Sequence, residues 1–169
     1  MKLPTASARV QADKKAIWNE FRSAESADFY TVGYSGRSID EFVAMLRSVG
    51  VATLFDVRQN PVSMYKPDFS KRNLARHLKA GGIEYLHLPH LGVPREIRAQ
   101  ASDAQNRDVI WEWYDSNIVE QHIPPNLTHF LNMAEHPIAL MCLEQDPTSC
   151  HRHRLSIRLE RYGLTSFDL

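Results

Sequence analysis

The residues best suited to chemistry lie in one short segment of the 169-residue chain, residues 139–152. It contains both cysteines of the chain, and its candidate reactive side chains are Cys142, Cys150, His151 and Arg152. The apolar run 138–143 is too short for an ordinary helix and is typical of an interior β-strand. Asp146 followed by Pro147 is a helix-start signal, so the last three of these side chains are expected in the first turn of a helix. Unpaired N–H groups and the helix dipole favour negative charge there, which predicts an anion site or a thiolate.

The elements that must position this segment follow a regular pattern. Strands are expected over residues 29–34, 52–57, 84–88 and 138–143, and helices over 38–49, 70–80, 108–121, about 126–136, and from 147 to 162. Ser38 and Glu41 form a capping box, and Gly50 and Gly163 are proposed helix stops. The order β-α-β-α-β-α-α-β-α predicts an α/β domain with a mainly parallel sheet flanked by helices.

Two assignments concern the ends of this pattern. Residues 1–28 are expected to form a separate N-terminal arm or helix, followed by the α/β domain over 29–169. In the C-terminal helix, Leu155, Leu159 and Tyr162 are predicted to face the core.

Ionisable and polar side chains collect just after the predicted strands. Ligands of open parallel sheets bind at the carboxyl ends of the strands, so these side chains are expected to share a pocket. They are Tyr34, Ser35 and Arg37; Asp56 and Arg58; His87 and His90; and Glu144, Cys150, His151 and Arg152.

The candidate catalytic residues are Cys150, Asp56, Glu144 and His87. Cys150 would be activated by the helix terminus and by its cationic neighbours, although a cysteine in the first turn can also pack inward. Asp56 and Glu144 suit a general base or a contact to a ribose hydroxyl, and His87 suits acid–base catalysis near neutral pH. Cys142 is interpreted as a small core residue, and His90 as a surface loop residue.

Substrate binding is assigned to Tyr34, Ser35, Arg37, Arg58, His151 and Arg152. The three arginines follow different strands and could together hold a phosphate or carboxylate. The alternative pairs Arg58 with Asp56 or Glu144 in a structural ion-pair network, because buried arginine seldom goes unpaired.

A metal site is disfavoured at this stage. Seven residues separate Cys142 from Cys150, whereas structural zinc sites use shorter spacings, and the adjacent Cys150 and His151 do not readily converge on one ion. No metal and no cofactor are therefore assigned. The dinucleotide and phosphate-loop fingerprints are also missing from the sequence.

Composition restricts the partners and the compartment. Twenty basic and twenty acidic side chains cancel, so no global attraction to nucleic acid or membrane is encoded. No apolar stretch is long enough for a membrane span, and no signal-peptide core is seen, so a cytoplasmic protein with reduced cysteines is expected. The oligomeric state is left open.

Four segments in order resemble a known family. They are Thr31–Ser35 with Ser38, Leu54–Arg58 with Pro61, Tyr85–Pro89 with Leu91 and Gly92, and Cys142–Arg152. Together they are similar to the bacterial and archaeal domain of unknown function family 488, over roughly residues 31–163. The resemblance implies an α/β domain and marks the strand-borne cysteine, the acidic residue two positions on and the closing Cys-His-Arg as its hallmark. One departure is Tyr34, where many members are expected to carry histidine.

The function predicted from these observations is an enzyme with a strand-end pocket for a small anionic, phosphate- or nucleotide-like substrate, with Cys150 as a candidate catalytic group. The alternative is a nucleic-acid-binding or other non-catalytic binding module, in which basic residues of the second and last helices would contact a phosphate backbone. Sulfur transfer is a weaker alternative, because Asp-x-Arg after a strand resembles the opening of rhodanese domains, whereas their six-residue loop is not evident here.

Overall fold

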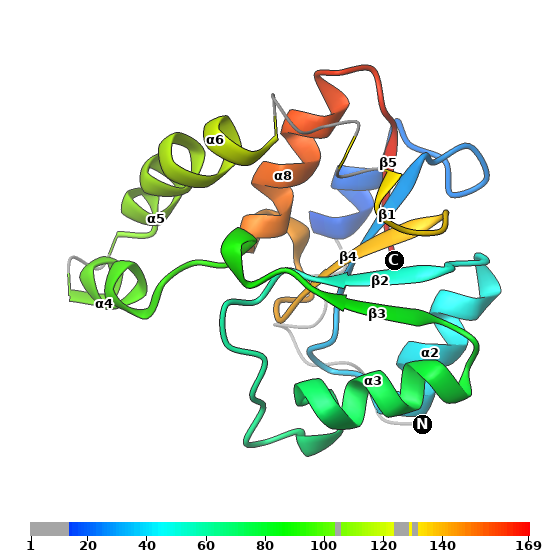
Figure 1. Ribbon diagram of the computed structural model, residues 1–169. Coiled ribbons are helices and arrows are strands. Elements are labelled where there is room, and N and C mark those ends of the chain that lie inside the picture. The colour runs from blue at the N-terminus through cyan, green and yellow to red at the C-terminus, as the bar shows by residue number, and fades with distance from the viewer. Residues whose placement is uncertain (1–13, 104–105, 124–128, 130–131) are drawn as a thin grey trace.

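Five parallel strands form the centre of the protein in the computed structural model (Figure 1). The structure describes residues 14–103, 106–123, 129 and 132–169. The strands are β1 (Phe29–Gly33), β2 (Thr53–Asp56), β3 (Glu84–His87), β4 (Ile138–Cys142) and β5 (Ser166–Asp168), in the order β3-β2-β4-β1-β5. The predicted fold class, an α/β domain with a parallel sheet, is confirmed.

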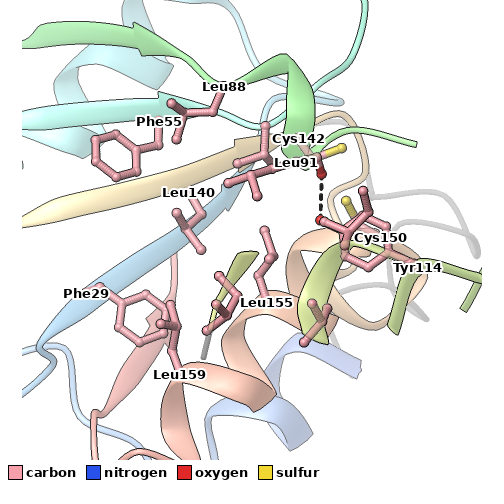
Figure 2. Close-up of a cluster of buried hydrophobic side chains, with 14 of the residues drawn as sticks. Phe29, Phe55, Leu88, Leu91, Tyr114, Leu140, Cys142, Cys150, Leu155 and Leu159 are labelled. Atoms are coloured by element: carbon pink, nitrogen blue, oxygen red, sulfur yellow. Dashed lines mark hydrogen bonds between the residues drawn. The ribbon is translucent and has the colours of Figure 1, made fainter. Parts of the chain in front are cut away.

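Helices cover both faces of this sheet, because the strands alternate apolar side chains toward each face. On one face α2 (Ile39–Ser48) and α3 (Lys71–Ala80) pack against strand side chains such as Val32 and Leu54. On the other face lie α8 (His151–Glu160) and α5 (Asp108–Tyr114). Figure 2 shows Phe29, Phe55 and Leu140 of the strands meeting Leu155 and Leu159 of α8 in this second core.

The helical segment between β3 and β4 projects to one side of the sheet (Figure 1). It comprises α4 (Arg95–Asp103), which the sequence did not predict, and α5, which continues through a π-helical turn (Asp115–Val119) into α6 (Glu120–His122). The continuous run from α5 to α6 matches the helix predicted over 108–121. The helix predicted over 126–136 falls largely on residues outside the described part of the chain.

Three other expectations need correction. The chain ends in a fifth strand, β5, which pairs with β1 and was not predicted. Tyr162 does not face the core, because its side chain follows the end of α8 and is 47% exposed. Cys150 is the N-cap of α8 and does not lie in its first turn, because a short 3-10 turn, Pro147–Ser149, precedes the helix.

The N-terminal residues that the structure describes dock on the C-terminal part of the chain. Residues 14–19 are helical, and the Trp18 ring contacts the His153 ring edge-on at 4.5 Å. Arg22 forms two hydrogen bonds to the Glu160 carboxylate, at 2.8 and 2.9 Å. Asn19 donates a hydrogen bond to the Asp168 carbonyl at 2.8 Å. These contacts attach this segment to α8 and β5.

Helix α2 has the ends that its sequence predicts. Ser38 and Glu41 form a complete capping box, and Gly50 lies directly after the C-cap with φ of +73°. A Cβ at Gly50 would have open space around it, so only the backbone conformation disfavours another residue. We expect Gly50→Ala to lower the free energy of unfolding by about 1 kcal/mol, the cost of left-handed backbone for a residue with a Cβ. Urea denaturation would measure this, and an unchanged midpoint would contradict it.

Candidate functional site

A cavity of about 200 Å³ lies beyond the carboxyl ends of the central strands. The ends of β1, β2 and β4 are in register there, since Gly33 pairs with Cys142 and Asp56 pairs with Met141. The helices that follow β1 and β4 pack on opposite faces of the sheet, which opens a crevice between these adjacent strands. Its wall includes Tyr34 after β1, Arg58, Gln59 and Asn60 after β2, Cys142, Leu143 and Glu144 at the end of β4, and Cys150 and His151 at the start of α8.

The projecting helices supply the opposite wall of this cavity. Their contributions are Arg98 from α4, Arg107 from the turn between the helices, and Ile110 and Trp111 from α5. Arg98 and Arg107 are exposed, and Arg107 donates a hydrogen bond to the Ser149 carbonyl at 3.2 Å. The sequence reasoning missed these residues, because they lie on a helical excursion and follow no strand. The only sequence signal was the presence of basic side chains between the third and fourth strands.

Both cysteines face one histidine on the cavity floor. The Nδ1 atom of His151 lies 3.6 Å from Cys142 Sγ and 3.8 Å from Cys150 Sγ. Its Nε2 atom is 2.9 Å from the Val57 carbonyl oxygen, which can only accept a hydrogen bond. The Nε2 atom therefore carries a proton, and when the ring is neutral Nδ1 presents a lone pair to the two sulfurs. Both cysteines are free, and they lie beside the ring of Tyr114 in Figure 2.

The two thiols differ in their acidity because they share a small buried space. Burial raises the pKa of Cys150, but the hydrogen bond from Cys142 and the charges of His151 and Arg152 outweigh burial, and the net shift is downward. The hydrogen bond to Cys150 and then burial raise the pKa of Cys142. Cys150 is therefore the more acidic of the two thiols. Burial lowers the pKa of His151, yet the adjacent Cys150 charge reverses the sign and raises it.

Arg58 is held in a network of buried side chains. Its guanidinium donates to both oxygens of Asp56, at 2.8 and 2.6 Å, and to the Phe69 carbonyl at 2.9 Å. It also lies 3.2 Å from the hydroxyl of Tyr34, whose ring stacks on Phe69. Burial lowers the pKa of Arg58, but the contacts to Asp56 reverse this and raise it, so the cation is permanent. This arrangement is the ion-pair network that the sequence left as an alternative, although Arg58 also borders the cavity.

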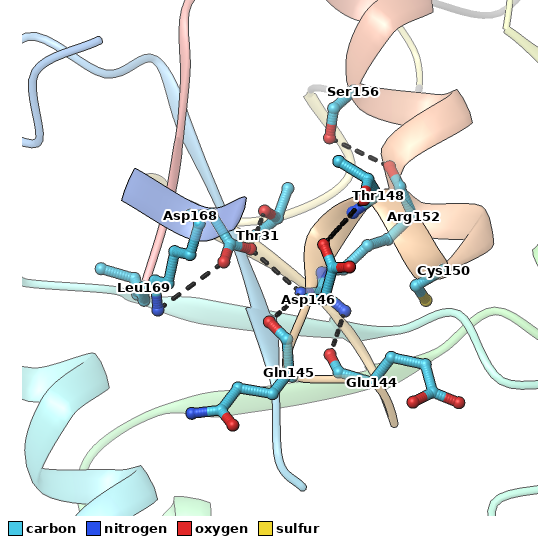
Figure 3. Close-up of polar contacts among 12 residues, drawn as sticks. Thr31, Glu144, Gln145, Asp146, Thr148, Cys150, Arg152, Ser156, Asp168 and Leu169 are labelled. Carbon is cyan, nitrogen blue, oxygen red and sulfur yellow. Dashed lines mark hydrogen bonds and ion pairs between the residues drawn. The ribbon is translucent and has the colours of Figure 1, made fainter. Parts of the chain in front are cut away.

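Arg152 is fully buried and points away from the cavity. Figure 3 shows its guanidinium donating to the Glu144 carbonyl at 2.5 Å and to Asp168 Oδ1 at 3.1 Å. A further contact reaches the Gln145 carbonyl at 3.3 Å. Arg152 therefore fixes the loop after β4 to β5. Its positive charge raises the electrostatic potential around the thiols, but Arg152 does not line the cavity.

The structure brings together only part of the predicted site. Tyr34, Arg58, Glu144, Cys150 and His151 line the cavity. The other candidates lie elsewhere: Asp56 is buried under Arg58, Ser35 and Arg37 lie beyond β1, and Arg152 lies behind the loop. His87 contacts the Arg58 carbonyl at 2.9 Å and Lys71 at 3.2 Å, outside the cavity.

Arg37 does not join the other two arginines. Its guanidinium donates to the Gly33 carbonyl at 2.9 Å and to the Leu169 carbonyl at 3.0 Å. These contacts tie the end of β1 to the residue that follows β5. The three arginines that follow strands therefore stabilise three separate parts of the structure, and the exposed cations of the cavity are Arg98 and Arg107.

Glu144 is the carboxylate that reaches the cavity. Its side chain is about one-third exposed and lies 3.8 Å from Arg107. Burial and the nearby Cys150 charge raise the pKa of Glu144, with Arg107 acting in the opposite direction. A carboxylate with a raised pKa beside a cavity is suited to carrying a proton.

The fold and cavity together define a parallel α/β protein with a cavity at the strand ends. The chain belongs to the family described as Domain of unknown function DUF488, which matches residues 38–159, most of its length. No curated protein and no solved structure shows significant similarity to the chain. Family membership thus supports the predicted resemblance and supplies no reaction. No helix among the described residues has the length and apolar character needed to cross a membrane.

Proposed function

We propose that the protein is an enzyme that binds a small anionic substrate in the strand-end cavity and transforms it where Cys142, Cys150 and His151 meet. The observation that carries this proposal is the joint placement of these three reactive side chains on the wall of one cavity whose opposite wall holds Arg98 and Arg107. A volume of about 200 Å³ suits a small molecule. The compartment we propose is the cytoplasm, where both thiols stay reduced.

The cations supply the selectivity for negative charge. Arg107 is 59% exposed, lies 3.8 Å from its ion partner Glu144 and donates one hydrogen bond to the Ser149 carbonyl, which leaves further guanidinium N–H groups for a ligand. Arg98 is exposed on α4, and Arg58 provides a fixed charge at the other side. A phosphate or carboxylate placed between them would gain bidentate hydrogen bonds. Trp111 and Tyr34 offer apolar faces for the rest of a nucleotide-like substrate.

Nucleic-acid binding is the less favoured function. It requires the basic residues of the last helix to face a phosphate backbone. Arg152, however, is completely buried against Asp168, and Arg154 forms a bidentate pair with Asp115. Both of these arginines of the last helix are therefore engaged within the protein. Arg98 and Arg107 at the cavity are exposed and lack such a buried or bidentate ion pair, which favours a small ligand.

Arg107→Ala tests the anion pocket. We expect it to weaken binding of inorganic phosphate or adenosine monophosphate at least about tenfold, the loss of one charge-assisted contact of roughly 1.4 kcal/mol. Because Arg107 is exposed, the melting temperature should stay within about 1–2 °C of the wild type. Isothermal titration calorimetry and thermal melting would measure both.

A matched control for that variant is Arg161→Ala, an exposed arginine beyond the end of α8 and outside this cavity. It should leave phosphate affinity unchanged. Equal losses in both variants would indicate general electrostatic attraction, and no binding by the wild type would remove the anionic substrate class.

A further inference from the structure

The group Cys142, Cys150 and His151 also has the composition of a metal centre. Its two sulfurs and the Nδ1 nitrogen all lie within 4.8 Å of one another, and all three residues are buried. Sequence spacing argued against such a site, because neighbouring residues rarely bind one ion. The backbone between them resolves this objection: Cys150 is the extended N-cap, with ψ of 148°, and His151 is the first helical residue. The change of conformation lets adjacent side chains face the same point.

The distances agree with a tetrahedral zinc ion. Zn–S bonds of about 2.3 Å and Zn–N bonds of about 2.05 Å place S and N ligands about 3.5–3.6 Å apart at the tetrahedral angle. The observed separations from Nδ1 are 3.6 Å to Cys142 Sγ and 3.8 Å to Cys150 Sγ. Both sulfur-to-nitrogen separations therefore lie within a few tenths of an ångström of those around a bound zinc ion.

The histidine is already oriented as a metal ligand. Its Nε2–H donates to the Val57 carbonyl at 2.9 Å, which leaves the Nδ1 lone pair directed at the sulfurs. Zinc-binding histidines usually make such a second hydrogen bond to a carbonyl or carboxylate, which fixes both the tautomer and the ring orientation. The Tyr114 ring, 5.3 Å from the His151 ring, also restricts its movement.

The charges favour a divalent ion. Two thiolates in this buried space would repel each other, and Arg152 behind them supplies one positive charge that is already shared with Asp168. Zn²⁺ bound by two thiolates and a neutral imidazole has no net charge. Binding therefore removes the repulsion and places a neutral group in the core.

We infer that Cys142, Cys150 and His151 bind one zinc ion whose fourth position opens into the strand-end cavity. All three residues line that cavity, so the open side faces the space assigned to substrate. Three protein ligands with one open position are the pattern of catalytic zinc sites, in which a bound water ionises near neutral pH. This inference deepens the proposed function and rests on it for the reaction class alone.

The reaction class that follows is hydrolysis of a small anionic ester. The zinc-bound hydroxide forms a bond to the electrophilic phosphorus or carbon, the ester bond breaks, and the leaving oxygen takes the proton that the water released. Glu144 lies at the cavity edge and is suited to pass that proton. Water is the only co-reactant, and no oxidation state changes.

Metal analysis tests the site without any substrate. We expect the full chain, purified without chelators and reconstituted with zinc alone, to retain about one zinc per chain after exhaustive dialysis. Cys142→Ser, Cys150→Ser and His151→Gln should each retain less than about a tenth of that amount. His153→Gln is the matched control, because His153 lies on the same helix but packs against Trp18. It should retain full zinc.

Cobalt substitution provides a second measurement that does not depend on how well the variants fold. The chain has only two cysteines, so thiolate-to-cobalt charge transfer in the wild type can come only from Cys142 and Cys150. Intense visible bands of tetrahedral cobalt are also expected. Stoichiometric zinc with both spectral features supports the inference. A folded wild-type protein that retains no zinc and shows neither feature would overturn it.

The two proposals fail in different ways. A chain that binds phosphate through Arg107 but retains no zinc keeps the anion pocket and loses the metal centre. A chain that retains zinc but shows no anion binding keeps the metal centre and loses the anionic substrate class.

Discussion

Asp168→Ala is expected to lower the free energy of unfolding by about 3–5 kcal/mol, the usual cost of breaking a buried ion pair from one side. Both side chains of the Arg152–Asp168 pair are completely buried. Removing the carboxylate leaves a guanidinium in the core whose charge Asp168 no longer offsets. Asp168 Oδ1 also accepts a hydrogen bond from Thr31 at 2.5 Å, so the variant loses a link between β5 and β1 as well. Chemical denaturation followed by circular dichroism would measure the change.

Asp115→Ala is the matched control for this prediction. Asp115 pairs with Arg154 through two hydrogen bonds, but both side chains are about one-third exposed. Water solvates the remaining guanidinium there, so the expected loss is only about 0–1 kcal/mol. Equal effects at the two positions would show that burial does not determine the strength of the Arg152 pair.

Gly33→Ala is expected to cost at least about 3 kcal/mol, the upper end of typical overpacking penalties. A Cβ at Gly33 would lie 1.7 Å from the Glu144 carbonyl oxygen and 2.5 Å from its carbon. These are backbone atoms, so no side-chain rotation can relieve the contact. The same carbonyl accepts the hydrogen bond from Arg152, and moving it would disturb the loop that carries Cys150. Thermal and urea denaturation would measure the loss.

Gly50→Ala serves as the control for Gly33→Ala, since it adds the same methyl group to open space. The comparison separates steric overlap from backbone conformation, because Gly33 does not have a positive φ and Gly50 does. A Gly33→Ala protein as stable as Gly50→Ala would mean that the loop after β4 moves freely. That result would also weaken the description of a preformed cavity floor.

The sequence by itself determined the fold class and the main elements. Local signals were sufficient there: the capping box at Ser38 and Glu41, the stop at Gly50, and short apolar runs between helices all act within a few residues. Alternation of strands and helices then required a parallel sheet. The sequence also predicted a reactive site after β4, because both cysteines and a histidine lie close together in the chain there.

Other features escaped the sequence because nonlocal contacts create them. Strand β5 has three residues and no periodic pattern, and it is defined by its pairing with β1, more than 130 positions earlier in the chain. Helix α4 has few apolar residues, and its position over the cavity depends on packing against α5. Tyr162 was assigned to the core by spacing, but α8 ends at Glu160, before that position.

The tertiary structure alone decided which polar residues meet. Asp56 ends β2, Arg58 follows it, and Arg152 lies in the first turn of α8, yet buried pairing removes Asp56 and Arg152 from the cavity and leaves Arg58 at its border. Arg98 and Arg107 enter it from a distant helical segment. The convergence of Cys150 and His151 on Cys142 depends on the backbone change at the start of α8. Side-chain direction and long-range packing set these relations, and neither can be read from residue type or spacing.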